Sequence, residues 1–154
     1  MLMFEITADD IALLDDESLR TLIGLLCESE VRSRGFPTSS VTWGGNQNAA
    51  DGGLDVRVTL PSGSAIDGFV PRPATGFQVK KEEMPRAAIL SEMRPSGAIR
   101  PVIQELADTG GAYVIVSSTS STADSALRSR HNAMIEATDD IHNKGSLFLD
   151  FYDR

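Results

Sequence analysis

The chain has 154 residues, a formal net charge of −8 and a single cysteine. This length suits one domain with its own hydrophobic core, and one cysteine excludes an internal disulfide and favours a cytoplasmic setting. No apolar stretch reaches the length of a membrane span, and the first residues lack the basic start of a signal peptide, so we expect neither feature.

Charge is distributed unevenly along the chain. Residues 1–17 hold six acids and no base, whereas the remainder holds 14 bases and 16 acids. Between Arg72 and Arg100 there are six bases and three acids, so that segment could form a local basic face. We expect an acidic N-terminal segment over residues 1–14 and a single domain over residues 15–154, which should not attract DNA strongly from a distance.

Hydrophobic periodicity predicts the order of the elements. Acids precede an apolar run that ends near Gly35, which predicts a helix beginning after Asp15. Further helices are predicted over residues 99–107 and 121–138, and strands over residues 40–43, 54–60, 65–70, 76–81, 112–117 and 147–152. The resulting order, α-β-β-β-β-α-β-α-β, predicts an α/β fold with a mixed sheet flanked by helices.

Polar residues stand inside two of these strands, where core residues would be expected. Asp55 interrupts one apolar strand, and Gln78 and Lys80 share one face of another strand whose opposite face is apolar. A carboxylate on one strand, with an amide and an ammonium group on another, can converge on a divalent metal and a water. These groups are the minimal set for cleaving a phosphodiester.

The metal expected at such a site is Mg²⁺, which prefers oxygen ligands and takes one or two carboxylates. Asp55 is the natural first ligand, and Gln78 can lend its amide oxygen. The first helix offers a second carboxylate, and Glu30 is predicted over Glu28 because it lies four residues beyond the apolar Leu26, on the inward face. The alternative for Glu30 is a helix-end acid that turns to solvent, and the choice between Glu30 and Glu28 stays open.

Lys80 is predicted to hold the attacking water near the metal and to stabilise charge on the phosphate. The alternative is a lysine at a strand end that reaches into solvent. Lys81 points to the opposite face and is expected to be uninvolved. Asp51 is interpreted as a turn residue beside two glycines, with a supporting role at the site left open.

Two motifs and the order of the elements carry a resemblance to a known family. Asp-Gly-Gly-Leu-Asp over residues 51–55 and Phe-Gln-Val-Lys over residues 77–80 resemble the PD-(D/E)XK nuclease superfamily, and in particular its Mrr-like restriction endonuclease type, where glutamine replaces the usual second acid. The resemblance covers roughly residues 15–120. It implies a restriction-endonuclease-like fold with an α-β-β-β-α-β core, and a Mg²⁺-dependent endodeoxyribonuclease, with Mn²⁺ as a substitute, whose site holds Asp55, Gln78 and Lys80.

Similar domains occur as N-terminal effectors of larger bacterial anti-phage proteins, including antiviral STAND ATPases. The resemblance therefore implies double-stranded DNA as partner, clustering through a larger C-terminal region, and no membrane partner. The alternative is a catalytically inactive domain of the same fold that serves nucleic-acid binding or protein assembly. Both the glutamine at position 78 and the net negative charge of the chain support that alternative.

Overall fold

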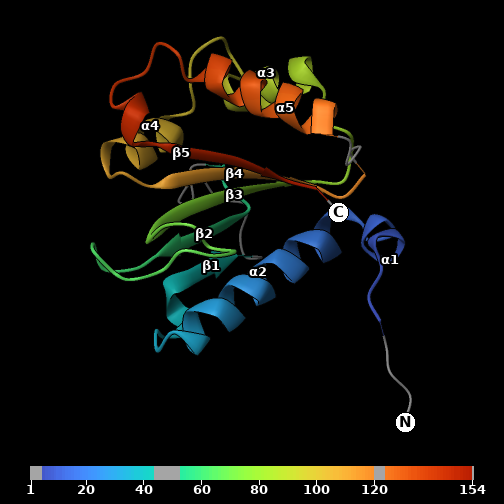
Figure 1. The fold of residues 1–154 in the computed structure, drawn as a ribbon, viewed down its shortest axis with the longest axis vertical. Helices are drawn as coiled ribbons and strands as arrows, with labels where there is room; N and C mark the ends of the chain where they lie inside the picture. Colours follow the sequence, from blue (N-terminus) through green and yellow to red (C-terminus); the bar gives the residue numbers. More distant parts are fainter. Residues whose placement is uncertain (1–4, 44–52, 120–123, 154) are drawn as a thin grey trace.

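A five-stranded mixed sheet forms the centre of the molecule (Figure 1). The computed structural model describes residues 5–43, 53–119 and 124–153. The first three strands of the sheet are antiparallel, and the third, fourth and fifth are parallel. In sheet order, which is also chain order, the strands are β1 (Val41–Trp43), β2 (Val56–Thr59), β3 (Ala74–Lys80), β4 (Ala112–Ser117) and β5 (Phe148–Tyr152).

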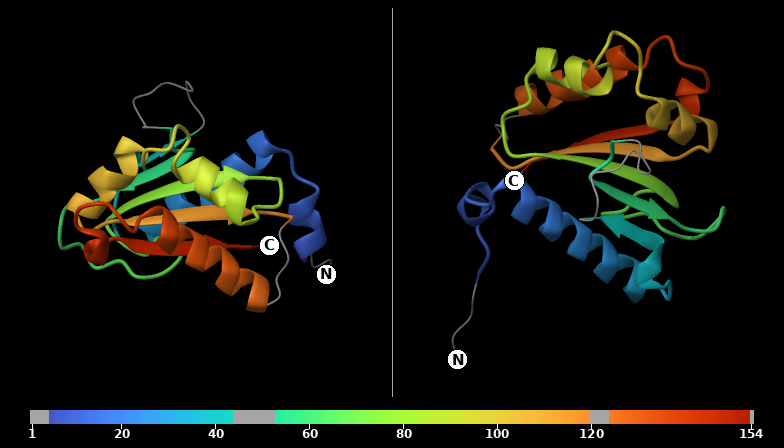
Figure 2. Two further views of the ribbon diagram at one scale, coloured as in Figure 1. Left: turned by 90° about the horizontal axis from the view of Figure 1, so that it is seen from above. Right: turned by 180° about the vertical axis from the view of Figure 1, so that it is seen from behind.

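Helices cover both faces of this sheet. The long helix α2 crosses one face with the short α1 beside it, and three helices lie over the other face, as the views from above and behind also show (Figures 1 and 2). The helices are α1 (Ala8–Ala12), α2 (Asp16–Ser33), α3 (Arg86–Met93), α4 (Pro101–Asp108) and α5 (Asp124–Ala137), with 3₁₀ turns η1 (Thr38–Ser40) and η3 (Lys144–Ser146).

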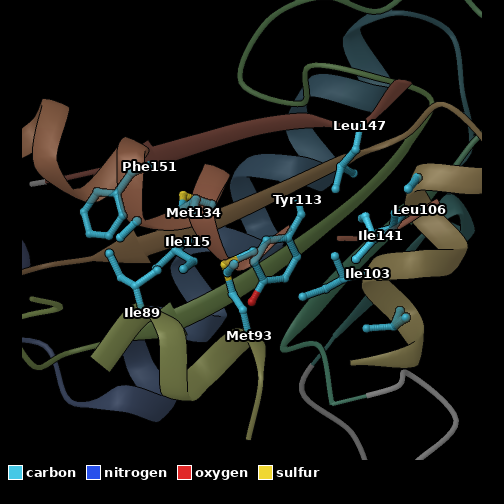
Figure 3. Close-up of a cluster of buried hydrophobic side chains, with 14 of the residues drawn as sticks. Ile89, Met93, Ile103, Leu106, Tyr113, Ile115, Met134, Ile141, Leu147 and Phe151 are labelled. Carbon is cyan, nitrogen blue, oxygen red and sulfur yellow. The ribbon is translucent and has the colours of Figure 1, made fainter. Parts of the chain in front are cut away.

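The sheet separates two hydrophobic cores. Toward α2, the helix buries a row of side chains at four-residue spacing, and β3 contributes Phe77 and Val79. Toward α3, α4 and α5, Tyr113 of β4 lies among Met93 and Ile103 (Figure 3). Each fully buried side chain of this size contributes about 1.5–3 kcal/mol. β4, which lies between β3 and β5, is buried along its whole length.

Local chemistry fixes where α2 begins and how closely it approaches the sheet. The Asp15 side chain accepts a 2.7 Å hydrogen bond from the Ser18 N–H, which caps the helix and lowers the pKa of Asp15 below its usual value. Further along α2, a Cβ on Gly24 would lie 2.4 Å from the ring of Trp43. A glycine at this point therefore lets the helix pack directly on the ring of Trp43.

The expected α/β class is confirmed, and the arrangement is consistent with a restriction-endonuclease-like fold. One predicted strand is wrong: residues 65–70 form no strand. The Val70 N–H donates to the Glu30 carboxylate and the Phe69 carbonyl accepts from the Tyr152 hydroxyl, so these main-chain groups are satisfied by side chains instead of a neighbouring strand.

Two helices of the structure were not predicted from the sequence. The sequence patterns gave neither α1 nor α3, which are five and eight residues long. Short helices carry too few turns for a clear apolar period. Within the described residues, no helix has both the length and the apolar character needed to cross a membrane.

Candidate active site

Asp55 lies directly before β2, opposite the carboxyl end of β3. Its main-chain N–H donates to the Phe77 carbonyl at 3.0 Å, which continues the pairing of the two strands. Its carboxylate turns back onto β3, where Oδ2 accepts from the Val79 N–H at 2.8 Å and from Gln78 Nε2 at 3.2 Å. The expected meeting of Asp55 and Gln78 is thus present in the structure.

The amide of Gln78 is oriented differently from the expectation. Its Nε2 donates both to Asp55 and to the Gly53 carbonyl at 2.9 Å, while its Oε1 faces the Tyr113 hydroxyl across a long 3.4 Å contact. The amide nitrogen, and not the oxygen, therefore points at Asp55. In this arrangement Gln78 orients the carboxylate, because a nitrogen donor satisfies two oxygen acceptors at once.

Gly53 allows the Arg100 guanidinium group to approach the backbone closely. Its φ is +86°, in the region that favours glycine, and a Cβ there would lie 2.7 Å from Arg100 Nη1. The guanidinium of Arg100 therefore lies directly over the backbone that leads into Asp55. This contact links α4, which begins after Arg100, to the start of β2.

Lys80 pairs with a carboxylate from α3. Lys80 Nζ lies 3.3 Å from Glu92 Oε2, and Arg100 Nη2 lies 3.2 Å from Glu92 Oε1. Arg100 Nε also donates to the Glu92 carbonyl at 2.6 Å, so Arg100 contacts both the side chain and the main chain of Glu92. The Glu92 side chain is 15% exposed and that of Lys80 is 32% exposed, so the ammonium group remains within reach of a ligand.

Asp55 pairs with a cation from the opposite side of the sheet. Arg20 of α2 places Nε 3.2 Å from Asp55 Oδ1. We call the six residues gathered here the carboxyl-end cluster: Arg20, Asp55, Gln78, Lys80, Glu92 and Arg100. The cluster holds three cations against two carboxylates, so its own charge favours an anion.

Tyr113 lies in the core (Figure 3), and its hydroxyl faces Gln78 of this cluster. Burial raises the pKa of Tyr113 well above its usual range, the nearby carboxylate of Glu92 raises it further, Arg100 opposes that rise, and Asp55 adds to it. Tyr113 is therefore a neutral hydroxyl donor at ordinary pH. Both carboxylates therefore lie near enough to the Tyr113 hydroxyl to raise its pKa.

Glu30 does not join the cluster, which corrects the predicted ligand set. It lies ten residues beyond Arg20 on α2, about 15 Å along the helix axis. Its Oε2 accepts from the Val70 N–H at 2.7 Å, and Arg34 lies 3.8 Å from its Oε1. Leu26, which marked the inward face in the prediction, is 42% exposed, but Glu30 itself does face the protein, with a side chain that is 14% exposed.

The basic stretch of the sequence does not form one face. Arg86 pairs with Glu136, and Arg94 pairs with Asp140, both at the α5 side of the molecule. Arg72 lies at the amino end of β3. Of the six bases, Lys80 and Arg100 share the pairing with Glu92. Asp51 lies outside the described residues, so the interpretation of its turn stays a prediction.

Three residues of the cluster were missed by sequence reasoning: Arg20, Glu92 and Arg100. Glu92 was missed because α3 was missed, although the four-residue spacing of Ile89 and Met93 is a signal of a helix with one buried face. Across the described residues, no group of three or more histidine, cysteine or acidic side chains lies close enough to hold a metal ion. A metal here would need amide, water or phosphate oxygens besides a carboxylate.

Comparisons with protein-family models, with curated proteins and with solved structures find no match to this chain.

Proposed function

We propose that the chain is a metal-dependent DNA endonuclease domain that hydrolyses phosphodiester bonds and acts as an effector in anti-phage defence. The observation that carries the proposal is the meeting of Asp55 Oδ2 with Gln78 Nε2, 3.2 Å apart, at a strand end from which Lys80 also projects. Carboxylate, amide and ammonium groups at one strand end have the chemistry to hold a divalent cation and a phosphate.

The donor set around Asp55 fits Mg²⁺ or Mn²⁺. Asp55 supplies a carboxylate, Gln78 would supply an amide oxygen after rotation of its terminal group, and these ions keep waters and phosphate oxygens for the remaining positions. A cation bound there would activate a water and stabilise charge on the phosphate. Without a bound cation, Gln78 Nε2 and the Val79 N–H fix the orientation of the Asp55 carboxylate.

Lys80 and Glu92 complete the proposed site. The Lys80 ammonium group stabilises the negative charge that develops on the phosphate, and Glu92 holds that group in position. We therefore assign the second acid of the site to Glu92 instead of Glu30. Arg100, paired with the same carboxylate, adds positive charge where the phosphate would approach.

Cleavage of supercoiled plasmid with Mg²⁺ or Mn²⁺ tests the proposal. Asp55→Asn and Lys80→Met should each reduce the rate about 100-fold or more, while circular dichroism and melting show an intact fold. Lys81→Met is the matched control, because it removes the next lysine along the chain and should cleave like wild type. Wild-type rates in both folded variants would contradict the assignment.

The pairing of the cluster also supports a second function, nucleic-acid binding without cleavage. Each oxygen of Asp55 and Glu92 already faces a cation or an N–H donor, and the cluster carries one excess positive charge. Such a site would bind a phosphate backbone with no metal present. Fluorescence anisotropy with labelled duplex in a chelator would favour this function if binding persisted and no divalent metal produced cleavage.

Clustering of several copies follows from the endonuclease proposal. One site cuts one strand, so a double-strand break favours two domains, and the net charge of −8 weakens DNA capture by a single copy. Tethering two copies raises the effective concentration of the second copy toward roughly millimolar values, which allows two weakly binding domains to occupy one duplex. Fusion to a tetrameric coiled coil should accelerate plasmid linearisation, and equal rates per site in dilute protein would count against clustering.

A further inference from the structure

The ion pair between Arg20 and Asp55 connects α2 to the proposed metal ligand. Arg20 Nε lies 3.2 Å from Asp55 Oδ1, and the two side chains are 20% and 14% exposed. Water and salt screen a pair at this depth less than a surface pair. A second cation that binds Asp55 is therefore repelled by the positive charge of Arg20.

The pair is ionic but lacks hydrogen-bond geometry. Arg20 Nε is buried and has no hydrogen-bond acceptor among the residues that the structure describes. A buried N–H group without an acceptor is unfavourable, so Arg20 would gain from a better oriented oxygen. Phosphate oxygens are strong acceptors for guanidinium groups, and the excess positive charge of the carboxyl-end cluster draws a phosphate to this place.

Asp55 has one oxygen that is open to exchange. Oδ2 accepts from the main-chain N–H of Val79 and from the Gln78 side chain, and the Val79 bond holds it on β3 even when the Gln78 amide turns. Oδ1 faces Arg20. A divalent cation would therefore approach Oδ1, where it competes directly with the guanidinium group because both are positive.

We propose that Arg20 gates the metal site. In the free protein it neutralises Asp55; when nucleic acid binds, it turns to a backbone phosphate and leaves Oδ1 open. This inference rests on the proposed endonuclease function and adds its regulation. It requires that the metal bind weakly without nucleic acid and more strongly with it. The factor by which nucleic acid raises metal affinity must equal the factor by which the metal raises nucleic-acid affinity.

Mn²⁺ affinity, measured by calorimetry or electron paramagnetic resonance, tests the gate. Without nucleic acid, Arg20→Gln should bind Mn²⁺ about tenfold more tightly than wild type, within the roughly 5- to 150-fold range of such couplings. Arg20→Lys keeps the charge and should stay near wild type. Arg34→Gln is the matched control, since Arg34 lies on the same helix beside the carboxylate of Glu30 and should leave affinity unchanged.

A short phosphorothioate duplex, which resists hydrolysis, supplies the second arm of the experiment. Adding it should tighten Mn²⁺ binding more in wild type than in Arg20→Gln, because the variant has no guanidinium group to transfer. Equal affinities of wild type and Arg20→Gln without duplex, or equal gains with it, would overturn the gate.

Asp55→Asn separates failure of the gate from failure of the proposed function. If Asp55→Asn binds Mn²⁺ like wild type in both arms, the metal does not bind at Asp55 and both ideas fail. If Asp55→Asn loses binding while Arg20→Gln matches wild type, the gate alone fails.

A measurement on wild-type protein decides the matter if Arg20→Gln does not fold. The Arg20 Nε–H resonance should shift when duplex and Mg²⁺ are added together, since it gains a phosphate oxygen as acceptor. The Arg34 Nε–H resonance should stay in place. An unmoved Arg20 resonance under conditions where the duplex binds would overturn the gate.

Discussion

Both ends of the parallel strands β3, β4 and β5 gather charged side chains, but these side chains bind different partners. At the amino ends, Arg72 Nη1 donates to the carbonyls of Gly110 at 2.9 Å, Gly111 at 3.3 Å and Ser146 at 2.5 Å. The first two carbonyls directly precede β4, and Ser146 ends the 3₁₀ turn η3 that leads into β5. At the carboxyl ends, the carboxyl-end cluster mostly pairs one side chain with another.

The difference separates groups that hold the fold from groups that are free to exchange partners. A main-chain carbonyl cannot leave Arg72 unless the strands move apart, so that arginine acts as a structural clamp. Glu30 also holds the fold, because it accepts a hydrogen bond from the main-chain N–H of Val70. Side-chain pairs such as Lys80 with Glu92 can reorganise around a ligand without unfolding the sheet. Ligand sites of open α/β sheets lie at the carboxyl ends of the strands for related reasons.

Removing the clamp should have the largest effect on stability. Arg72→Met deletes the donor to three carbonyls and the contact of the guanidinium carbon with the Phe148 ring, 5.4 Å from its centre. We expect the free energy of unfolding to fall by about 3 kcal/mol, measured by urea denaturation. Plasmid cleavage per folded molecule should stay at the wild-type rate.

Arg86→Met is the control for this clamp. Arg86 pairs with the exposed side chain of Glu136, so its loss should leave the denaturation midpoint near wild type. If Arg72→Met and Arg86→Met unfold at the same urea concentration, the main-chain contacts of Arg72 do not stabilise the fold as proposed.

Two acids of nearly equal burial sharpen the comparison. The side chains of Glu30 and Glu92 are 14% and 15% exposed. Glu30→Gln keeps an oxygen for the Val70 N–H and should cost about 1 kcal/mol of stability with no change in cleavage. Glu92→Gln removes the counter-charge of Lys80 and should slow single-turnover cleavage by roughly tenfold to a hundredfold, because a misplaced catalytic group loses that much. Equal cleavage by the two variants would remove the distinction between the two regions.

Five of the six predicted strands are present, because alternation and continuous apolar runs reflect the sheet directly. Gln78 and Lys80 share a face, and β4 is buried throughout, as the pattern required. Helix faces were harder to assign. Leu25 and Leu26 of the predicted apolar run are exposed. Glu30 faces the protein as expected, but a helix face does not say which point along the sheet a residue reaches, and Glu30 lies about 15 Å along α2 from Arg20.

The partners of the site residues could not be read from the sequence. Glu92 lies on α3, an eight-residue helix between Pro85 and Pro95 whose length is too short for a clear period. Arg20 reaches Asp55 from the opposite face of the sheet. Such pairings depend on packing between distant segments, which local patterns do not encode.

Gln78→Glu tests whether the carboxyl-end cluster accepts a new charge balance. In the free protein, the new carboxylate would face two oxygen acceptors, the Gly53 carbonyl and Asp55, so we expect a loss of about 1–3 kcal/mol. Mn²⁺ should recover that loss, because it would bind between the two carboxylates. Thermal melting with and without Mn²⁺ measures both effects. Gln78→Ala serves as reference, and recovery of equal size in both variants would place the metal elsewhere.

The smallest effect concerns Tyr152, a further side chain bound to the main chain. Its hydroxyl donates to the Phe69 carbonyl at 2.9 Å, and burial, with Asp150 and Glu30 nearby, raises the pKa of Tyr152 from 10.0 to about 12. Between these two values the unfolded chain gives up the proton while the folded protein keeps it. Stability that is fully present below pH 10 is therefore lost as the pH rises toward 12.

Tyr152→Phe should be slightly less stable than wild type at neutral pH, because the Phe69 carbonyl loses its donor. It should then lose less stability than wild type through the alkaline range, so the two curves of unfolding free energy against pH converge. Tyr113, whose pKa is also raised by burial, titrates in both proteins and cancels in the comparison. Parallel curves would show that the Tyr152 hydroxyl is not held by the fold. If Tyr152→Phe changes the cleavage rate at neutral pH, loss of the Tyr152 contact with the main chain alters the carboxyl-end cluster. The groups that hold the fold and the groups of the cluster would then not be independent.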